Sequence, residues 1–117
     1  MTTERGATTA AQAEVPGIDR TDLQHYDLSA PGRLMIQNRV VISPEAQPIR
    51  HKHPGEEIIY VLEGSLEYQI EGSEPRTYTA GEALTVPAGT VHSVHGDGTE
   101  LATYVVEEGK PFISLAD

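Results

Sequence analysis

Apolar and polar residues alternate in short runs from residue 33 onward, and this period of two restricts the chain to an all-β fold. In the first run, Leu34, Ile36 and Ile42 share one parity. Gln37 and Arg39 take the other parity. Because alternate side chains of a strand leave opposite faces, this pattern predicts a half-buried strand. No segment shows a helical period of comparable strength.

Later runs repeat the pattern between clusters of Gly, Pro and Ser. After Gly64, the residues Leu66, Tyr68 and Ile70 alternate with polar residues. The turn at residues 71–75 predicts a hairpin with the run that follows it. Three further runs come later, over residues 83–89, 90–95 and 100–108. We therefore expect seven or eight short strands, and their short connections favour antiparallel neighbours.

The first residues of the chain lack this pattern. Residues 1–17 are rich in Ala, Thr, Glu and Gly without a period, so they predict a flexible N-terminal tail. Residues 18–117 have the size of one domain and show no internal repeat. The sequence therefore predicts a short tail followed by a single β domain.

The composition excludes several classes of partner and of site. With 18 acidic and 8 basic residues, the chain has a formal net charge of -10, which would repel nucleic acid and acidic membranes. No apolar stretch approaches the roughly 18 residues of a membrane span, and no secretory signal is visible, so we expect no membrane partner and a cytoplasmic location. Because cysteine is absent, any metal has to be held by imidazole nitrogen and carboxylate oxygen.

Two segments hold four of the five histidines and carry the candidate chemistry. His51 and His53 are two positions apart, so on a strand their side chains leave the same face about 6 to 7 Å apart and can converge on one ion. Glu57 keeps the same parity and can return an oxygen to that side. His92 follows a second turn and is the fourth candidate ligand. His95 has the opposite parity and should face away.

These segments resemble the two sequence motifs of the cupin superfamily, and in particular those of small, single-domain, metal-binding cupins. The first motif, His-x-His-x3-Glu-x6-Gly, is matched by His51, His53, Glu57 and Gly64. The second motif, Gly-x5-Pro-x-Gly-x2-His, is matched by Gly81, Pro87, Gly89 and His92. Two positions depart from the family pattern: Glu45 stands in place of a glycine, and Gly96 stands in place of an asparagine.

The resemblance implies a double-stranded β-helix, which is a jelly-roll barrel with one metal ion inside it, over residues 18–117. The ligands that it implies are His51, His53, Glu57 and His92. Three imidazoles and one carboxylate suit a divalent transition-metal ion, of which we favour Fe(II), while Mn, Ni, Co, Cu and Zn stay open. On an octahedral ion, four protein ligands leave two positions for water, dioxygen or a chelating substrate.

The function that we expect is that of a mononuclear metal-dependent enzyme, an Fe(II)-type oxygenase or dioxygenase acting on a small organic substrate that chelates the metal. Two alternatives stay open: a metal-dependent isomerase or lyase of a small polar metabolite, and a cupin that binds a small ligand without turnover. No residue beyond the metal ligands is assigned a catalytic role, because tyrosines such as Tyr60, Tyr68 and Tyr104 usually pack half-buried on a sheet.

The first motif also places apolar residues on both faces of its strand. If Ile59 and Val61 follow the metal ligands into the barrel, then Ile58, Tyr60 and Leu62 face outward. An exposed apolar patch usually meets another surface. We therefore expect a homodimer.

Overall fold

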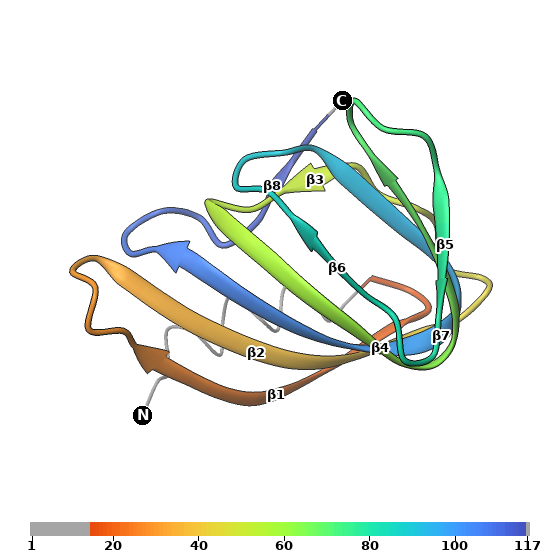
Figure 1. Cartoon of the computed structure of the whole chain (residues 1–117), viewed down its shortest axis with the longest axis horizontal. Helices are drawn as coiled ribbons and strands as arrows, with labels where there is room; N and C mark the ends of the chain where they lie inside the picture. The colour runs from red at the N-terminus through yellow and green to blue at the C-terminus, as the bar shows by residue number, and fades with distance from the viewer. Residues whose placement is uncertain (1–14, 117) are drawn as a thin grey trace.

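The computed structural model of the chain describes residues 15–116, and every regular element in this range is a β-strand (Figure 1). Among these residues there is no helix that could cross a membrane. The strands are, in chain order, β1 (Ile18–Asp27), β2 (Arg33–Ile42), β3 (His51–Lys52), β4 (Gly55–Ile70), β5 (Arg76–Thr79), β6 (Ala83–Val86), β7 (His92–Glu107) and β8 (Ser114–Leu115). The predicted all-β fold class is confirmed.

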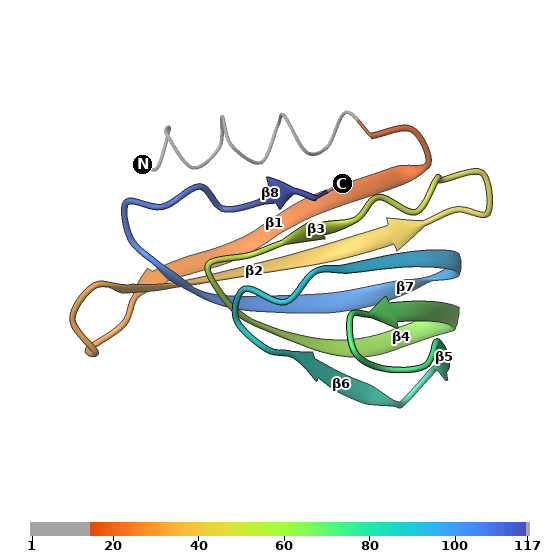
Figure 2. The same cartoon turned by 90° about the horizontal axis from the view of Figure 1, so that it is seen from above.

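All paired strands are antiparallel, and they wrap into a barrel (Figures 1 and 2). One path of neighbours runs β1-β2-β7-β3-β8, and β4 pairs with β5, β6 and β7. The strands β4 and β7 each have 16 residues and stay paired from Gly55↔Val106 to Ile70↔His92. These two strands therefore connect the two halves of the barrel, and β7 also carries β2 along its other edge.

Two glycines allow the paired backbones of β4 and β7 to approach closely. They lie where the sequence predicted breaks in the strands. Gly64 has φ of 72°, and a Cβ there would overlap the carbonyl oxygen of Asp97. On β7, Gly96 pairs with Leu66 and has φ of 146°, and a Cβ there would lie 2.5 Å from the carbonyl oxygen of Ser65. The expected breaks are therefore bends within continuous strands. The departure at Gly96 from the family pattern also acquires a structural reason, because no side chain fits there.

Strand β1 precedes the first run that the sequence analysis identified. It pairs with β2 from Ile18↔Ile42 to Asp27↔Leu34, with a register shift between Asp22 and Gln24. Residues 21–27 of β1 are all exposed, so the segment has no buried face and no apolar alternation to reveal it. Backbone pairing with β2 holds this strand in place.

The predicted N-terminal tail, residues 1–17, lies mostly outside the described residues, which begin at Val15. Within the described part, the carbonyl of Gly17 accepts a hydrogen bond of 2.9 Å from the N–H of Ser43. The end of the predicted tail therefore contacts the turn that follows β2.

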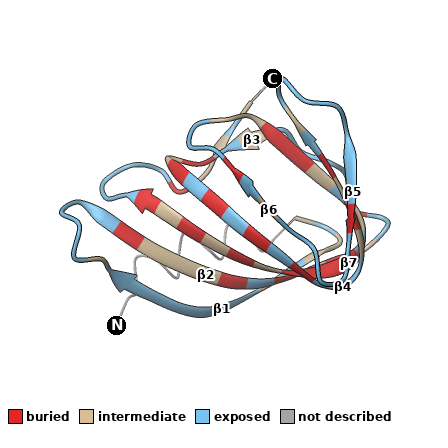
Figure 3. Ribbon diagram, viewed as in Figure 1, coloured by how far each residue is buried: buried red, intermediate tan, exposed pale blue. Residues whose placement is uncertain are grey.

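The core follows the parity that the sequence predicts for the first motif. Ile59 and Val61 are fully buried, whereas Ile58, Tyr60 and Leu62 are exposed (Figure 3). The buried apolar side chains of β4 pack with those of β2, β6 and β7 in one cluster that includes Val40, Ile42, Leu66, Val86 and Ala102. The inward faces of the long strands are therefore divided between this core and a cavity that contains the candidate site.

Candidate metal centre

The structure brings the four predicted ligands together. One ligand atom from each of His51, His53, Glu57 and His92 lies within 4.8 Å of the others. His51 lies on β3 directly opposite His92, the first residue of β7. His53 follows β3, and Glu57 is the third residue of β4. The group could hold a metal ion, as the sequence predicts.

A bend between β3 and β4 positions Glu57 next to the histidines. The segment turns at Pro54, whose carbonyl accepts a hydrogen bond from the N–H of Glu107 at 3.2 Å. Gly55 follows, and a Cβ at this position would overlap the carbonyl of Val105. Because β4 starts against β7 at this close contact, the chain returns with Glu57 buried and on the same side as the histidines.

Each of the three imidazoles is anchored through Nδ1 to a backbone carbonyl. The distances are 2.7 Å from His51 to Ile49, 3.0 Å from His53 to Phe112 and 3.0 Å from His92 to Thr90. A carbonyl oxygen only accepts, so each Nδ1 carries the proton, and in the neutral ring Nε2 keeps a lone pair. This arrangement selects the tautomer and fixes the ring of a metal-ligating histidine.

The Nε2 atoms of His53 and His92 face a carboxylate. Glu57 Oε1 lies 3.0 Å from Nε2 of His92 and 3.4 Å from Nε2 of His53, and the buried His53 Nε2 has no hydrogen-bond partner among residues 15–116. Two acceptors at this distance repel each other unless a proton or a cation lies between them. A divalent ion would satisfy all of these lone pairs together, so the donor set fits a transition metal.

The electrostatics prepare Glu57 and His51 for metal binding, whereas at His92 burial, which lowers the pKa, is outweighed by Glu57, which raises it, so an ion there would compete with a proton. Burial alone would raise the pKa of Glu57, but the neighbouring imidazoles of His53 and His92 hold that pKa well below the usual range. Burial, with a smaller contribution from His92, lowers the pKa of His51 to about 4. At neutral pH the carboxylate is therefore ionised and His51 is neutral, which are the forms that bind a metal.

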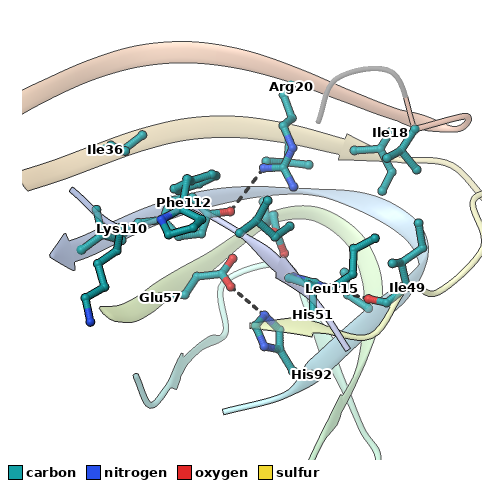
Figure 4. Close-up of a pocket in the computed structure, with 18 of the residues that line it drawn as sticks. Ile18, Arg20, Ile36, Ile49, His51, Glu57, His92, Lys110, Phe112 and Leu115 are labelled. Carbon is teal, nitrogen blue, oxygen red and sulfur yellow. Dashed lines mark hydrogen bonds and ion pairs between the residues drawn. The ribbon is translucent and has the colours of Figure 1, made fainter. Parts of the chain in front are cut away.

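The site borders a cavity of about 1020 Å³ (Figure 4). His51, Glu57 and His92 lie on its wall. Most of the remaining lining is apolar, including Ile18, Ile36, Val40, Ile42, Val94 and Phe112. A small organic molecule could therefore reach the metal centre while most of its surface contacts apolar side chains.

Two polar pairs in this cavity were not assigned to the site from the sequence. The hydroxyl of Tyr68 donates to Glu100 Oε1 at 2.5 Å, and Arg20 Nη1 donates to the hydroxyl of Tyr104 at 3.3 Å. Burial, with Glu57 as the next cause, raises the pKa of Glu100 to about 8, so this carboxyl keeps a proton at neutral pH. Both tyrosines are fully buried on their strands, where half-buried packing was expected, and both line the cavity.

Parity along β7 could have assigned two of these polar cavity residues, Glu100 and Tyr104, to the site. Glu100 and Tyr104 are an even number of positions from His92, so a continuous strand points all three to the same side. The break that was expected near Gly96 hid this relation. Arg20 carried no comparable signal, because its strand has no alternating pattern.

The remaining histidines lie outside the centre, in agreement with the sequence analysis. His95 is exposed, with Nδ1 at 3.5 Å from Glu67 Oε1. His25 is exposed on β1, and Glu56 next to the ligand Glu57 is also exposed.

Comparison with known proteins agrees with this geometry. A family model for the cupin domain matches residues 38–107, which contain all four candidate ligands. The chain belongs to the cupin family. Its barrel is accordingly the double-stranded β-helix that the two motifs predict.

This cupin is similar to proteins that include an oxidase and a lyase. KdgF from Halomonas sp. is 26% identical, with a TM-score of 0.64, over 80% of this chain and 83% of that chain. An oxalate oxidase in complex with the substrate analogue glycolate is 25% identical, with a TM-score of 0.65, over 89% of this chain and 58% of that chain. The dimethylsulfoniopropionate lyase DddQ of Ruegeria pomeroyi is 40% identical over 43 residues, which are 37% of this chain and only 21% of that protein.

Proposed function

We propose that this cupin is a mononuclear metal-dependent enzyme that acts on a small organic substrate able to chelate the ion. His51, His53, Glu57 and His92 would hold one divalent transition-metal ion. The observation that supports this most directly is the arrangement of the three imidazoles: every Nδ1 is bonded to a backbone carbonyl, which leaves every Nε2 available to an ion, and one ligand atom of each histidine and of Glu57 lies within 4.8 Å of the others. The adjoining cavity supplies the space for a substrate.

The reaction class that we place first is an Fe(II)-type oxygenation. The ion would supply Lewis acidity and, as Fe(II), a centre at which substrate and dioxygen meet. The nitrogen and oxygen donors suit iron, and the cavity wall around them is largely apolar, which excludes water from the reacting groups. Similarity to an oxalate oxidase over 89% of the chain supports an oxidative reaction.

A specific feature of the cavity favours a second candidate, a lyase or isomerase reaction. Glu100 is 3% exposed and shares a short hydrogen bond with Tyr68 in the same cavity as Glu57 and His92. A protonated carboxyl of this kind can donate a proton to a substrate and later take one back. The local similarity to a dimethylsulfoniopropionate lyase is in line with such chemistry.

Metal content tests the shared part of both candidates. We expect about one equivalent of metal, measured by elemental mass spectrometry, in protein purified without chelator. Replacing a ligand, as in His92→Ala, should remove it, whereas the matched change His95→Ala on the same strand should leave it unchanged. A parent protein that takes up no Fe(II), Mn(II) or Zn(II) would overturn the proposal.

Oxygen consumption separates the two reactions. The Fe(II)-loaded protein is mixed with a panel of chelating organic substrates, and dioxygen is followed with an electrode while the substrate is followed by chromatography. Substrate loss coupled to dioxygen uptake supports the oxygenase. Substrate loss without dioxygen uptake excludes the oxygenase and supports the lyase or isomerase. Binding without loss across the panel would indicate a ligand-binding cupin.

A further inference from the structure

We propose that Arg20 binds a carboxylate group of the substrate, so that the cavity takes a small organic acid with an apolar body, held by the guanidinium and by the metal centre. This inference rests on the proposed function, because it names the substrate class of the same site. It assigns a specificity role to a residue of β1, outside both cupin motifs.

The guanidinium of Arg20 extends from β1 into the cavity with an incomplete set of partners (Figure 4). Its Nη1 reaches the hydroxyl of Tyr104 at 3.3 Å, which is a long hydrogen bond. Its Nε is buried and has no acceptor within residues 15–116. A buried donor of a charged group is costly to leave unsatisfied, so the protein's own groups satisfy this guanidinium incompletely, and an anion in the cavity would offset part of that cost through its charge.

The charge of Arg20 is also uncompensated by direct pairing in the described part of the chain. Two buried acidic side chains share the cavity wall with it. Glu57 is engaged with His53 and His92, and Glu100 is engaged with the hydroxyl of Tyr68. No ion pair within 4.0 Å joins either carboxylate to Arg20 among the described residues. A divalent ion at the metal centre would add further positive charge, so the loaded cavity would attract an anion.

The form of the donor set favours a carboxylate over a phosphate group. The contact with Tyr104 uses Nη1, and a planar guanidinium matches a planar carboxylate through parallel hydrogen bonds. Near it the wall is apolar, with Ile18 and Ile36 on the same side of the cavity (Figure 4). The other non-histidine cation of the described lining, Lys110, has a 57% exposed side chain paired with Glu107. A single buried guanidinium suits a monoanion, whereas a phosphate dianion would require more donors.

Binding of a matched acid and amide tests this inference without knowledge of the natural substrate. The full chain is loaded with redox-inert Zn(II) and titrated calorimetrically with 4-methylpentanoate, with 4-methylpentanamide and with inorganic phosphate. We expect the acid to bind at least about tenfold more tightly than the amide or phosphate. Arg20→Gln should weaken binding of the acid by about tenfold or more and remove its advantage over the amide. Arg39→Gln, at an exposed arginine of β2, should bind as the parent does.

Each alternative outcome identifies what is wrong. Equal binding of acid and amide by the parent would overturn the role of Arg20, and this comparison needs no variant that has to fold. Binding of the acid that persists in Arg20→Gln but is lost in a His51→Ala, His53→Ala variant would place the carboxylate on the metal and overturn the inference, while the metal centre would stand. Phosphate binding as tight as that of the acid and dependent on Arg20 would overturn the choice of a carboxylate. If the parent takes up no Zn(II), the proposed function fails, and the acid and amide comparison on the metal-free chain still decides for or against Arg20.

Discussion

Single side chains in this protein acquire their chemistry from the backbone groups around them. His92 and His95 lie three positions apart on β7, yet the first is buried with Nδ1 held by the Thr90 carbonyl and the second is exposed beside Glu67. An identical ring is therefore a candidate ligand in one position and a surface residue in the other. Burial and the backbone acceptor make this difference, and the residue type alone does not.

Glu100 should make the stability of the metal-free protein depend on pH. Its pKa is raised to about 8 in the folded state from 4.5, so the folded protein binds this proton more tightly than the unfolded chain does. The stabilisation is then fully present below about pH 4.5 and is lost as the pH rises through 8. We expect Glu100→Gln to remove this loss of stability, on the order of 4 kcal/mol between pH 5 and 9. Urea unfolding in the presence of a chelator measures it.

A surface carboxylate provides the control for this experiment. Glu74 is exposed in the turn between β4 and β5, so Glu74→Gln should show the same pH dependence as the parent. Glu57 does not interfere between pH 5 and 9. Its pKa is lowered, so its contribution to the free energy of unfolding is lost only in acid. Parallel curves for the parent and Glu100→Gln would show that Glu100 ionises normally in the folded protein.

At the scale of elements, the pairing of the two long strands depends on one place where their backbones approach closely. Gly64 lies where the backbone of β4 passes the carbonyl of Asp97 on β7. Gly64→Ala would add both a left-handed backbone conformation for alanine and a clash with backbone, so we expect a loss of at least about 3 kcal/mol in the free energy of unfolding. Denaturant unfolding measures this loss.

Gly72 separates the two causes. It has φ of 89° and open space around its Cβ position, so Gly72→Ala carries the backbone strain without the clash. We expect this variant to lose only about 1 to 2 kcal/mol. If Gly64→Ala and Gly72→Ala lose the same free energy of unfolding, then β4 and β7 can move apart at Gly64 without cost.

The sequence predicted the elements that carry alternation and missed the element that does not. Parity placed Ile59 and Val61 inside the barrel and His51, His53 and Glu57 on one side of their segment, because those strands have one buried face, and the resemblance to the second cupin motif added His92 to the group. Strand β1 has no such face over residues 21–27, so only its pairing with β2 defines it. Arg20 could not be assigned to the site from the sequence for this reason. Its position follows from the three-dimensional register.

At the scale of the whole molecule, the proposed metal would join the segment of β3 and the start of β4 to the start of β7. Binding to the folded state alone stabilises it, by about 4 kcal/mol when free metal exceeds the dissociation constant a thousandfold. We expect chelator treatment to lower the melting temperature by about 10 °C or more, as measured by calorimetry. His92→Ala should melt at the same temperature with and without chelator, and a parent that does the same would contradict the prediction.

The outer face of β4 leads to a prediction about assembly. Ile58, Tyr60 and Leu62 are 45%, 46% and 37% exposed and lie in one row. We expect this row to pair with its copy in a homodimer, since burial of such a patch is favourable. Sedimentation velocity should show a dimer for the parent and a monomer for Ile58→Glu, Leu62→Glu. Leu23→Glu, which changes an exposed apolar residue of β1, should remain dimeric. A monomeric parent would contradict the expectation.

The anchoring of His53 by the Phe112 carbonyl has a consequence for the order of events in folding. This hydrogen bond spans 59 residues of sequence, and the contact of Glu57 with His92 spans 35. Contacts between such distant segments form slowly because a long loop has to close first. The complete set of ligands would then assemble only after the transition state for folding. An ion bound there would leave the rate of folding nearly unchanged and slow the rate of unfolding, so it would act mainly on the lifetime of the native protein.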